Sequence, residues 1–500
     1  MQVTLINPHT LIQPSDPLTT GICYFPVTLA YLAASLREQG HLVHVIDAFG
    51  EASTTVRRWR NWWMQGLPLE TLLGRLAQDG GDAEAPIFIY AGNLVSHEAT
   101  IQILKAVSQR FSRRPRIVVE NTQAVTAYAL KKALPDFFSA GADYVLTGEC
   151  EQRGPRLLSA LSSKEELKTL DGVYWRENGA VHGADPAGFI QDLDSLAFPA
   201  WDLFPLAGYW RLHYAHGPVT AKRWLPLLTS RGCPYPCRFC VVPETNRMKW
   251  RARSAKNVAS EMAFWGERLG IREFHIEDLN PTVDEERVRQ LSQEIESAGL
   301  KLTWKIVAGT KLDILKEPDT LHRMARAGCR YISMSPESGS PEILKRMGKP
   351  FRYDAAIELT RQMHREGIRS QACFVVGYPE ESDADRALTR RYIRRLAQAG
   401  LDEVALFICT PVPGSSIFGS EQGYQSLSEL SFSPVWRKTY RLLSRYRRGT
   451  YLRFLLWKLL YHPVKLLAQP FHFLSRRFQT KMEMTPYRAL SVMFWRWMHP

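Results

Sequence analysis

The stretch Ser230-Arg231-Gly232-Cys233-Pro234-Tyr235-Pro236-Cys237-Arg238-Phe239-Cys240 brings three cysteines together in the spacing C-x3-C-x2-C. Cysteine thiolates are the usual ligands of iron–sulfur clusters, and three of them leave one iron of a [4Fe–4S] cluster without a protein ligand. Zinc is the alternative, because C-x2-C pairs often bind zinc. A structural zinc site needs a fourth ligand nearby, yet no Cys or His follows Cys240 within thirty residues. The pattern therefore favours a cluster held by Cys233, Cys237 and Cys240.

The same pattern, with the aromatic Phe239 directly before the third cysteine, resembles the signature of the radical S-adenosylmethionine (SAM) superfamily. The resemblance implies that the amino and carboxylate groups of SAM bind the open iron. It also implies that an external flavodoxin- or ferredoxin-type donor reduces the cluster. Cleavage of SAM then gives a 5′-deoxyadenosyl radical, so the cofactors carry the difficult chemistry. Phe239 is expected to pack against the adenine or to shield the cluster.

The length and the cysteine usage indicate a large cytoplasmic protein. A chain of 500 residues predicts two or three domains. Of eight cysteines only three are clustered, which is typical of metal binding in a reducing compartment. Residues 1–8 predict a strand rather than a signal peptide, and no uncharged apolar run approaches the length that spans a bilayer. We therefore expect a cytoplasmic location.

Residues 1–160 alternate short β-branched runs with helical patterns. The runs are at residues 3–6, 42–46, 87–90, 117–119 and 144–146. Runs of this kind are typical of buried parallel strands, and the alternation predicts a Rossmann-like, doubly wound α/β sheet. Such sheets bind ligands at the carboxyl ends of their strands, so the loops that follow residues 90, 119 and 146 are the candidate binding loops.

This segment resembles the cobalamin-binding domain that precedes many radical SAM domains. The matching pieces are residues 26–34, residues 45–48 and Gly148-Glu149-x-Glu151. The resemblance implies that strand-end residues contact cobalamin. They are Asn93, Ser96, Gly148 and Glu149.

Two departures from that family are visible. No D-x-H-x-x-G motif is present, so no histidine is offered as a lower axial ligand of cobalt. The turn after the fourth strand is Glu120-Asn121-Thr122-Gln123, where the family usually has small residues that admit the corrin. The alternative to cobalamin is a Rossmann-like domain that serves packing or substrate docking.

Residues 161–225 predict a connector, with Asn178-Gly179 as the turn of a β-hairpin. Residues 226–420 then repeat strand, loop and helix. The candidate strands are residues 226–229, 273–276, 302–307, 331–334, 372–376 and 403–408. Parallel βα units form a barrel or an open sheet with the active site at the carboxyl ends of the strands. The segment resembles the partial (βα)6 barrel of radical SAM enzymes.

Polar or small residues follow several of these strands at positions where the family contacts SAM. The resemblance implies contacts by Glu277, Asp278 and Asn280 after the second strand, Glu337 and Ser338 after the fourth, and Gly377 after the fifth. Lys311 stands where the family often has an arginine. The positive charge is therefore kept, but the paired hydrogen bonds that a guanidinium can donate are lost. The sequence does not identify a residue that acts on the substrate.

Residues 421–500 predict an α-helical tail of a different composition. From Pro434 onward the tail has fourteen lysines and arginines against one acid, Glu483, so it carries +13 of the net charge of +14. Pro463, Pro470 and Pro486 are expected to divide it into short helices. Basic helices rich in aromatic residues lie in anionic membrane interfaces, which predicts peripheral attachment to the inner face of the membrane. The alternatives are a helical cap over the barrel and, least favoured, nucleic-acid binding.

These patterns predict a radical SAM enzyme that methylates an unactivated carbon with the help of cobalamin. The substrate is expected to be a small molecule or, because of the tail alone, a lipid-linked one. A second interpretation is a cyclase or rearrangement enzyme that transfers no methyl group, which the loop at residues 120–123 favours. A third is a non-catalytic, membrane-attached cobalamin or iron–sulfur sensor. A methylthiotransferase is disfavoured, since only Cys23 and Cys150 lie where that family has a second cysteine triad.

Overall fold

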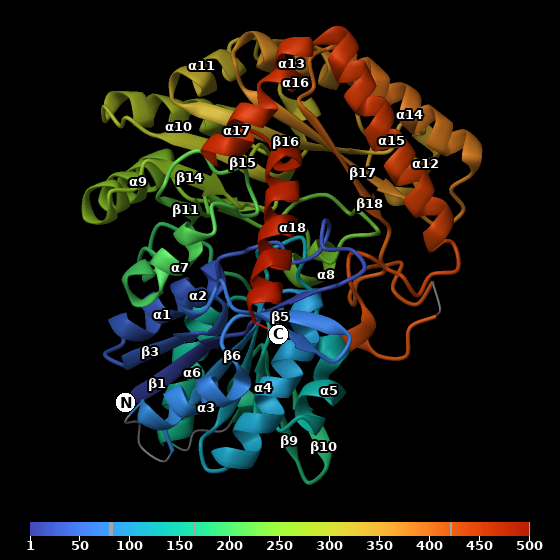
Figure 1. Cartoon of the computed structure of the whole chain (residues 1–500). Coiled ribbons are helices and arrows are strands. Elements are labelled where there is room, and N and C mark those ends of the chain that lie inside the picture. Colours follow the sequence, from blue (N-terminus) through green and yellow to red (C-terminus); the bar gives the residue numbers. More distant parts are fainter. Residues whose placement is uncertain (80–83, 164–166, 421–422, 500) are drawn as a thin grey trace.

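The computed structural model describes residues 1–79, 84–163, 167–420 and 423–499. Two large sheets lie one above the other, and the helices of the C-terminal tail run beside both (Figure 1). The predicted architecture of a Rossmann-like domain, a partial barrel and a helical tail is confirmed. Residues 421, 422 and 500 of the predicted tail lie outside the described residues.

The N-terminal sheet has the strand order β10-β9-β8-β7-β6-β1-β3. Its strands are β1 (Gln2–Asn7), β3 (Leu42–Asp47), β6 (Ile87–Ala91), β7 (Arg116–Glu120), β8 (Tyr144–Leu146), β9 (Val173–Glu177) and β10 (Ala180–Gly183). The first five pair in parallel where the sequence predicts strands, and the hairpin β9–β10 adds an antiparallel edge. Since β3 and β6 flank β1, the topological switch point lies between β1 and β6.

Helices cover both faces of this sheet. One layer contains α1 (Val27–Glu38) and α6 (Cys150–Ser163), and the other contains α3 (Leu69–Gln78), α4 (His97–Arg110) and α5 (Leu134–Ser139). Alternate residues of β6 enter two separate cores: Phe88 packs with the first layer, and Ile87 and Ile89 pack with the second. Because both faces are buried, β6 is apolar along its whole length.

A small antiparallel sheet at the edge of this domain is not predicted by the sequence. It consists of β2 (Thr10–Ile12), β5 (Trp62–Gln65) and β4 (Val56–Trp59). Two short helices, α2 (Ala48–Glu51) and α7 (Leu206–Arg211), contact each other close by.

The second sheet is a six-stranded open barrel whose strands pair in parallel in the order β11-β14-β15-β16-β17-β18. The strands are β11 (Trp224–Leu227), β14 (Glu273–Ile276), β15 (Thr303–Thr310), β16 (Cys329–Glu337), β17 (Arg369–Val376) and β18 (Glu403–Ile408). The flanking helices are α9 (Ala255–Leu269), α10 (Glu285–Ser297), α11 (Thr320–Arg326), α12 (Pro341–Met347), α13 (Tyr353–Arg365) and α14 (Asp383–Gln398). Ser254, Asp284, Ser340 and Ser382 cap four of these helices by accepting a backbone N–H, which fixes where each helix begins.

The tail is a chain of four helices packed on the barrel. They are α15 (Tyr440–Tyr461), α16 (Pro463–Leu467), α17 (Gln469–Ser475) and α18 (Lys481–Met498). Helix α15 lies against α14 and β18, and α18 passes β18 and reaches β4 of the small sheet (Figure 1). Asp402, at the start of β18, accepts hydrogen bonds from Lys458 through its backbone oxygen at 2.8 Å and from Lys465 through its side chain at 2.9 Å. The tail therefore packs on the barrel, as the alternative of a helical cap expects, and these contacts lie at the start of β18.

One sequence prediction about the tail is wrong. Pro463 and Pro470 lie in the first turns of α16 and α17, but Pro486 lies inside α18, which continues through it to Met498. Proline is tolerated near a helix start, where few N–H groups have intrahelical partners. Among the described residues no helix combines the length and the apolar character needed to cross a bilayer.

A buried ionic network joins the two sheets directly before the cysteine loop. Arg231, at the end of β12 (Ser230–Arg231), donates to Glu149 at 3.1 Å and to Glu151 at 2.7 Å. Arg251, in β13 (Arg251–Ala252), donates to Glu149 at 3.0 Å. All four side chains are buried. Burial raises the pKa of Glu149, but the two arginines overcome this and hold the pKa below its ordinary value.

We expect Glu149→Gln to lower the free energy of unfolding by about 3 kcal/mol, because it leaves buried arginines without their partner. Urea denaturation followed by circular dichroism measures the change. The matched control is Asp202→Asn, which breaks the exposed pair of Arg37 and Asp202 and should cost about 0.5 kcal/mol. Equal losses in the two variants would contradict the assigned role of the network.

Candidate functional site

The cysteine loop leaves the end of β12 in a tight turn that only glycine fits. Gly232 has φ +78°, and a Cβ at this position would lie 1.9 Å from the backbone oxygen of Lys249. Within the loop Cys240 N–H donates to the backbone oxygen of Cys237 at 3.1 Å. The loop ends at α8 (Val242–Asn246), whose first N–H points at the Cys240 sulfur at 3.5 Å. Local backbone geometry therefore gathers the three cysteines on one short loop.

The three thiols are unpaired and mostly buried. Cys237 is buried, and Cys233 and Cys240 are half-buried. Burial raises the pKa of Cys237 to about 11 and that of Cys240 to about 12, while the Lys349 ammonium opposes the shift. Because iron binds the thiolates, loading the site would release protons.

The loop fits an iron–sulfur cluster by the chemistry of its donors. Three cysteines and a nearby cation suit a cluster with three thiolate ligands, whose total charge is negative. Within the described ranges no three His, Cys, Asp or Glu side chains form a site for a single metal ion. When bound, the cluster would supply electrons to SAM at its open iron.

Two of the three polar residues that follow β14, Asn280 and Asp278, support the cysteine loop. The Asn280 amide points at the Cys233 sulfur at 4.0 Å, and its oxygen accepts from the Thr310 hydroxyl at 2.6 Å. Asp278 is buried and accepts hydrogen bonds from Thr229 and Ser230. Asn280 is thus the one beside the cysteines, and Asp278 fixes the start of the cysteine loop.

Glu277, the third of these residues, forms a pair with His216 at 2.6 Å. Burial raises the pKa of Glu277, yet His216, His275 and Lys481 lower it below its ordinary value. Burial and Lys481 lower the pKa of His216. The hydrogen bond with His216 therefore favours the anionic form of Glu277.

The remaining predicted SAM contacts lie around the mouth of the barrel. Glu337 has the left-handed φ +63° and accepts from Lys349 at 2.6 Å. Ser338 bonds within the β16–α12 turn by accepting from Ser340 N–H at 3.1 Å. A Cβ at Gly377 would lie 2.4 Å from Leu443 of the tail, so this glycine admits α15. Phe239 packs beside the apolar cluster that contains Met347 and Tyr378.

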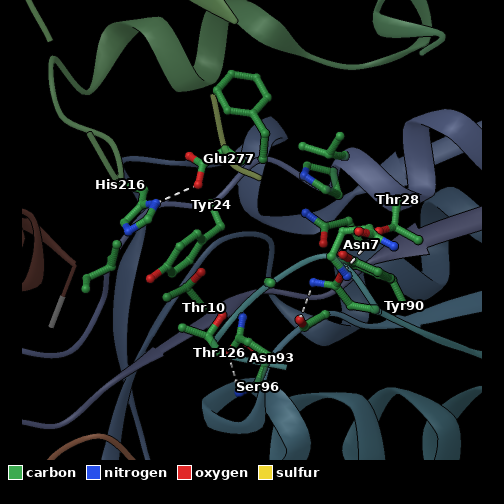
Figure 2. Close-up of a pocket in the computed structure, with 18 of the residues that line it drawn as sticks. Asn7, Thr10, Tyr24, Thr28, Tyr90, Asn93, Ser96, Thr126, His216 and Glu277 are labelled. Atoms are coloured by element: carbon green, nitrogen blue, oxygen red, sulfur yellow. Dashed lines mark hydrogen bonds and ion pairs between the residues drawn. The ribbon is translucent and has the colours of Figure 1, made fainter. Parts of the chain in front are cut away.

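A cavity of about 70 Å³ lies between the two sheets at the topological switch point. Figure 2 shows Asn93 and Ser96 on its lower side and the His216–Glu277 pair on its upper side. Asn93 accepts from Ser96 N–H at 3.0 Å, and the Tyr24 ring lies 4.8 Å from the His216 ring. The sheet thus places the predicted residues Asn93 and Ser96 at a site that also receives Glu277 from the barrel.

Two other predicted cofactor contacts do not line this cavity. Glu149 is occupied by the ionic network, and Gly148 donates its N–H to the Glu120 carboxylate at 2.7 Å. Burial raises the pKa of Glu120 to about 7, although backbone N–H groups of Gly148 and Leu130 oppose the shift. Contacts of Gly148 and Glu149 with a cofactor remain predictions.

Sequence reasoning missed His216 and Lys481. Lys481, the first residue of α18, donates to the backbone oxygen of Val307 at 2.7 Å and lies 3.4 Å from His216. Lys481 is one of many basic residues in the tail, and His216 is one of three histidines in the connector. No local pattern distinguishes either residue, because only the packing of α18 against the barrel brings them together.

A corrin matches this cavity in position and in hydrogen-bonding groups. The lining offers amides and hydroxyls at the carboxyl ends of β1, β6 and β7, where such sheets bind ligands. Asn121, however, bridges the cavity wall by accepting from the Thr28 hydroxyl at 3.0 Å and donating to the Gly92 oxygen at 2.8 Å. A corrin that entered at this wall would have to displace these contacts of Asn121.

Comparison with known proteins agrees with this geometry. Residues 227–393 match the Radical SAM superfamily, so the chain contains a radical SAM domain, as predicted. That domain implies a [4Fe–4S] cluster and SAM as cofactors.

Relatives with known names are distant. The chain is 29% identical to an uncharacterized methyltransferase of Pyrococcus horikoshii, over 59% of this chain and 61% of that protein. It is 25% identical to the cytidylyl-2-hydroxyethylphosphonate methyltransferase of Streptomyces wedmorensis, over 88% of this chain and 85% of that protein. It is 27% identical to the anaerobic magnesium-protoporphyrin IX monomethyl ester cyclase of a Synechocystis species, over 65% of each chain.

A solved structure shares the fold across both sheets. The radical SAM methyltransferase TsrM from Kitasatospora setae superposes with a TM-score of 0.65 at 16% identity, over 83% of this chain and 75% of that one.

We expect Cys233→Ala, Cys237→Ala or Cys240→Ala to abolish the brown chromophore and the reductive cleavage of SAM, because three thiolates are the minimum ligand set. Iron content and 5′-deoxyadenosine measured by chromatography test this. Cys329→Ala, at a solitary buried cysteine of β16, is the matched control and should keep both. Four irons retained by the triple Ala variant would contradict the assignment.

Proposed function

We propose that this chain is a radical SAM methyltransferase that acts on a small molecule bound between its two sheets. The observation that carries the proposal is the position of the cysteine loop. It lies at the carboxyl ends of the barrel strands, and Asn280 and Glu277 connect this end to a cavity lined by the Rossmann-like domain. Two of the named relatives are methyltransferases, which supports transfer of a methyl group.

In the proposed reaction one electron splits SAM into methionine and the 5′-deoxyadenosyl radical, which takes a hydrogen atom from the substrate carbon. A second SAM gives up its methyl group to the substrate radical, a second electron from the external donor completes the new carbon–carbon bond, and S-adenosylhomocysteine is left. The residues of this chain bind and orient the reactants: Asn280, held by Thr310, faces the cysteines, and the His216–Glu277 pair faces the cavity. Enclosing the substrate between two domains limits side reactions of the radical with other molecules.

Cobalamin is the proposed methyl carrier, supported by the position and the polar lining of the cavity. We expect reconstitution with hydroxocobalamin to leave about one corrin per chain after gel filtration, in a spectrum without histidine ligation. Ser96→Phe should abolish retention, since Ser96 lines the cavity, whereas Ser163→Phe at the exposed end of α6 is the matched control.

No retained corrin in the wild-type protein would contradict the cobalamin proposal. In that case 5′-deoxyadenosine without S-adenosylhomocysteine would favour a cyclase or rearrangement enzyme, which the bridging Asn121 and the relationship to a cyclase support. The absence of both products, with a cluster in place, would favour the non-catalytic sensor.

Peripheral attachment to an anionic membrane is a separate proposal, and it rests on the outer face of the tail. Exposed apolar side chains recur every three or four residues along α15, α16 and α17: Leu452, Leu456, Leu460, Val464, Leu467, Phe471 and Leu474. Exposed arginines flank them, among them Arg445, Arg453 and Arg476. Glu483, the one acidic residue from Pro434 onward, is buried and lies 3.3 Å from His472. A row of exposed apolar side chains with basic flanks matches an interfacial helix. The proposal concerns attachment and does not extend to a lipid substrate.

We expect liposomes rich in anionic lipid to co-sediment the full chain, with partial release by high salt. A double variant Phe471→Asp/Leu474→Asp should lose about tenfold in partitioning, because it places charge where apolar side chains would be buried. Val181→Asp, at an exposed position of the hairpin β9–β10, is the matched control. Equal sedimentation of the double variant and the wild type would contradict attachment through this face.

A further inference from the structure

A groove on the outer side of the cysteine loop has no role in the chemistry described so far. It has a volume of about 410 Å³ and is formed by the end of α12 and the segment that follows. Lys345, Gly348, Lys349, Phe351 and Tyr353 line it. Phe351 and Tyr353 give it an apolar floor, while the two lysines provide positive charge.

The groove lies directly against the cysteine loop. Arg238 N–H donates to the backbone oxygen of Met347 at 2.9 Å, which ties the loop to the last turn of α12. A Cβ at Gly348 would lie 3.0 Å from the backbone oxygen of Pro236. Pro236 and Arg238 are the residues directly before and after Cys237, so the groove wall contacts both neighbours of a cluster ligand.

Charge on this side of the loop is not neutralised. Among the ion pairs of the described residues, Arg238 and Lys345 have no acidic partner, and both side chains are exposed. Arg346 pairs with both nearby acids, Glu342 and Glu380, so the basic side chains Arg238, Lys345 and Arg346 exceed the acidic ones by one. Lys349 is neutralised by Glu337 at 2.6 Å. The excess positive charge on this side of the loop is therefore carried by the exposed Arg238 and Lys345.

The opposite side of the loop is reserved for the reaction. Asn280 contacts Cys233 there, and Glu277 leads on to the cavity between the sheets. In the proposed function SAM and the substrate would bind on this inner side. The outer side is then the short path for an electron donor, because tunnelling falls steeply with distance.

We propose that this groove is the docking site for an acidic one-electron carrier protein of the flavodoxin or ferredoxin type. The inference rests on the proposed radical SAM function. In the step concerned the reduced carrier loses one electron, the cluster changes from its 2+ to its 1+ state, and no bond is made or broken. Redox encounters of this kind use small interfaces, and complementary charge chiefly speeds association.

The test uses the full chain with its cluster reconstituted and flavodoxin in its hydroquinone form as the probe. Stopped-flow bleaching of the cluster absorbance gives the second-order rate constant of electron transfer. At low ionic strength Lys345→Glu and Arg238→Glu should each lower this constant by about tenfold, and the difference should shrink as salt screens the charges. Lys345→Arg should keep the wild-type value.

Two controls separate docking from other effects. Arg441→Glu, an equal charge reversal at an exposed position of α15, should leave the rate unchanged. Dithionite should reduce every variant at the wild-type rate, because a small reductant needs no docking site, and iron content verifies that each cluster is intact.

Unchanged flavodoxin kinetics in both Lys345→Glu and Arg238→Glu would overturn the proposal. An equal loss in Arg441→Glu would also overturn it, and would place the donor on the tail. A wild-type protein that dithionite cannot bleach would overturn the proposed radical SAM function and the docking site with it.

Discussion

The buried contact of Arg231 with Glu149 and Glu151 is the constraint on which the site depends. Arg231 is two residues before Cys233, and the glutamates follow the last parallel strand of the Rossmann-like sheet. The same interaction therefore fixes where the cysteine loop begins and how the loop faces the other domain. Burying these charges is tolerable only because each has a partner. Removal of one partner would leave an uncompensated charge beside the cluster ligands.

The tail also contributes to the site, through Lys481 at the start of α18. Lys481 reaches the His216–Glu277 pair through the open edge of the barrel, where β11 and β18 do not pair. The inner side of the tail is thus structural, whereas its outer side exposes Phe471 and Leu474. The two faces explain why one segment combines buried lysines with exposed apolar residues.

Local sequence patterns predicted most of the architecture. The strands β8, β14 and β18 were located without error, because short runs rich in β-branched and aromatic residues are typical of strands. The small sheet β2-β5-β4 was missed, since its strands are three or four residues long and β2 pairs with β5 from a distant part of the chain. Pro486 was misjudged, because a proline inside a helix usually ends or kinks it, whereas α18 continues through Pro486.

The site was predictable only in part. The cysteines share one loop, so their spacing alone predicts that they bind one metal cluster together. Glu149 illustrates the limit, because its motif is consistent with cofactor binding while its carboxylate is occupied by Arg231 and Arg251. Long-range pairs such as Lys481 with His216 depend on tertiary packing, which no periodicity in the sequence encodes.

The most direct test of the central claim is the metal and sulfide content of the anaerobically purified full-length protein. The account predicts about four irons and about four acid-labile sulfides per chain, with no stoichiometric zinc. About one zinc per chain without iron or sulfide would show that the three cysteines hold a structural ion, and would contradict the account.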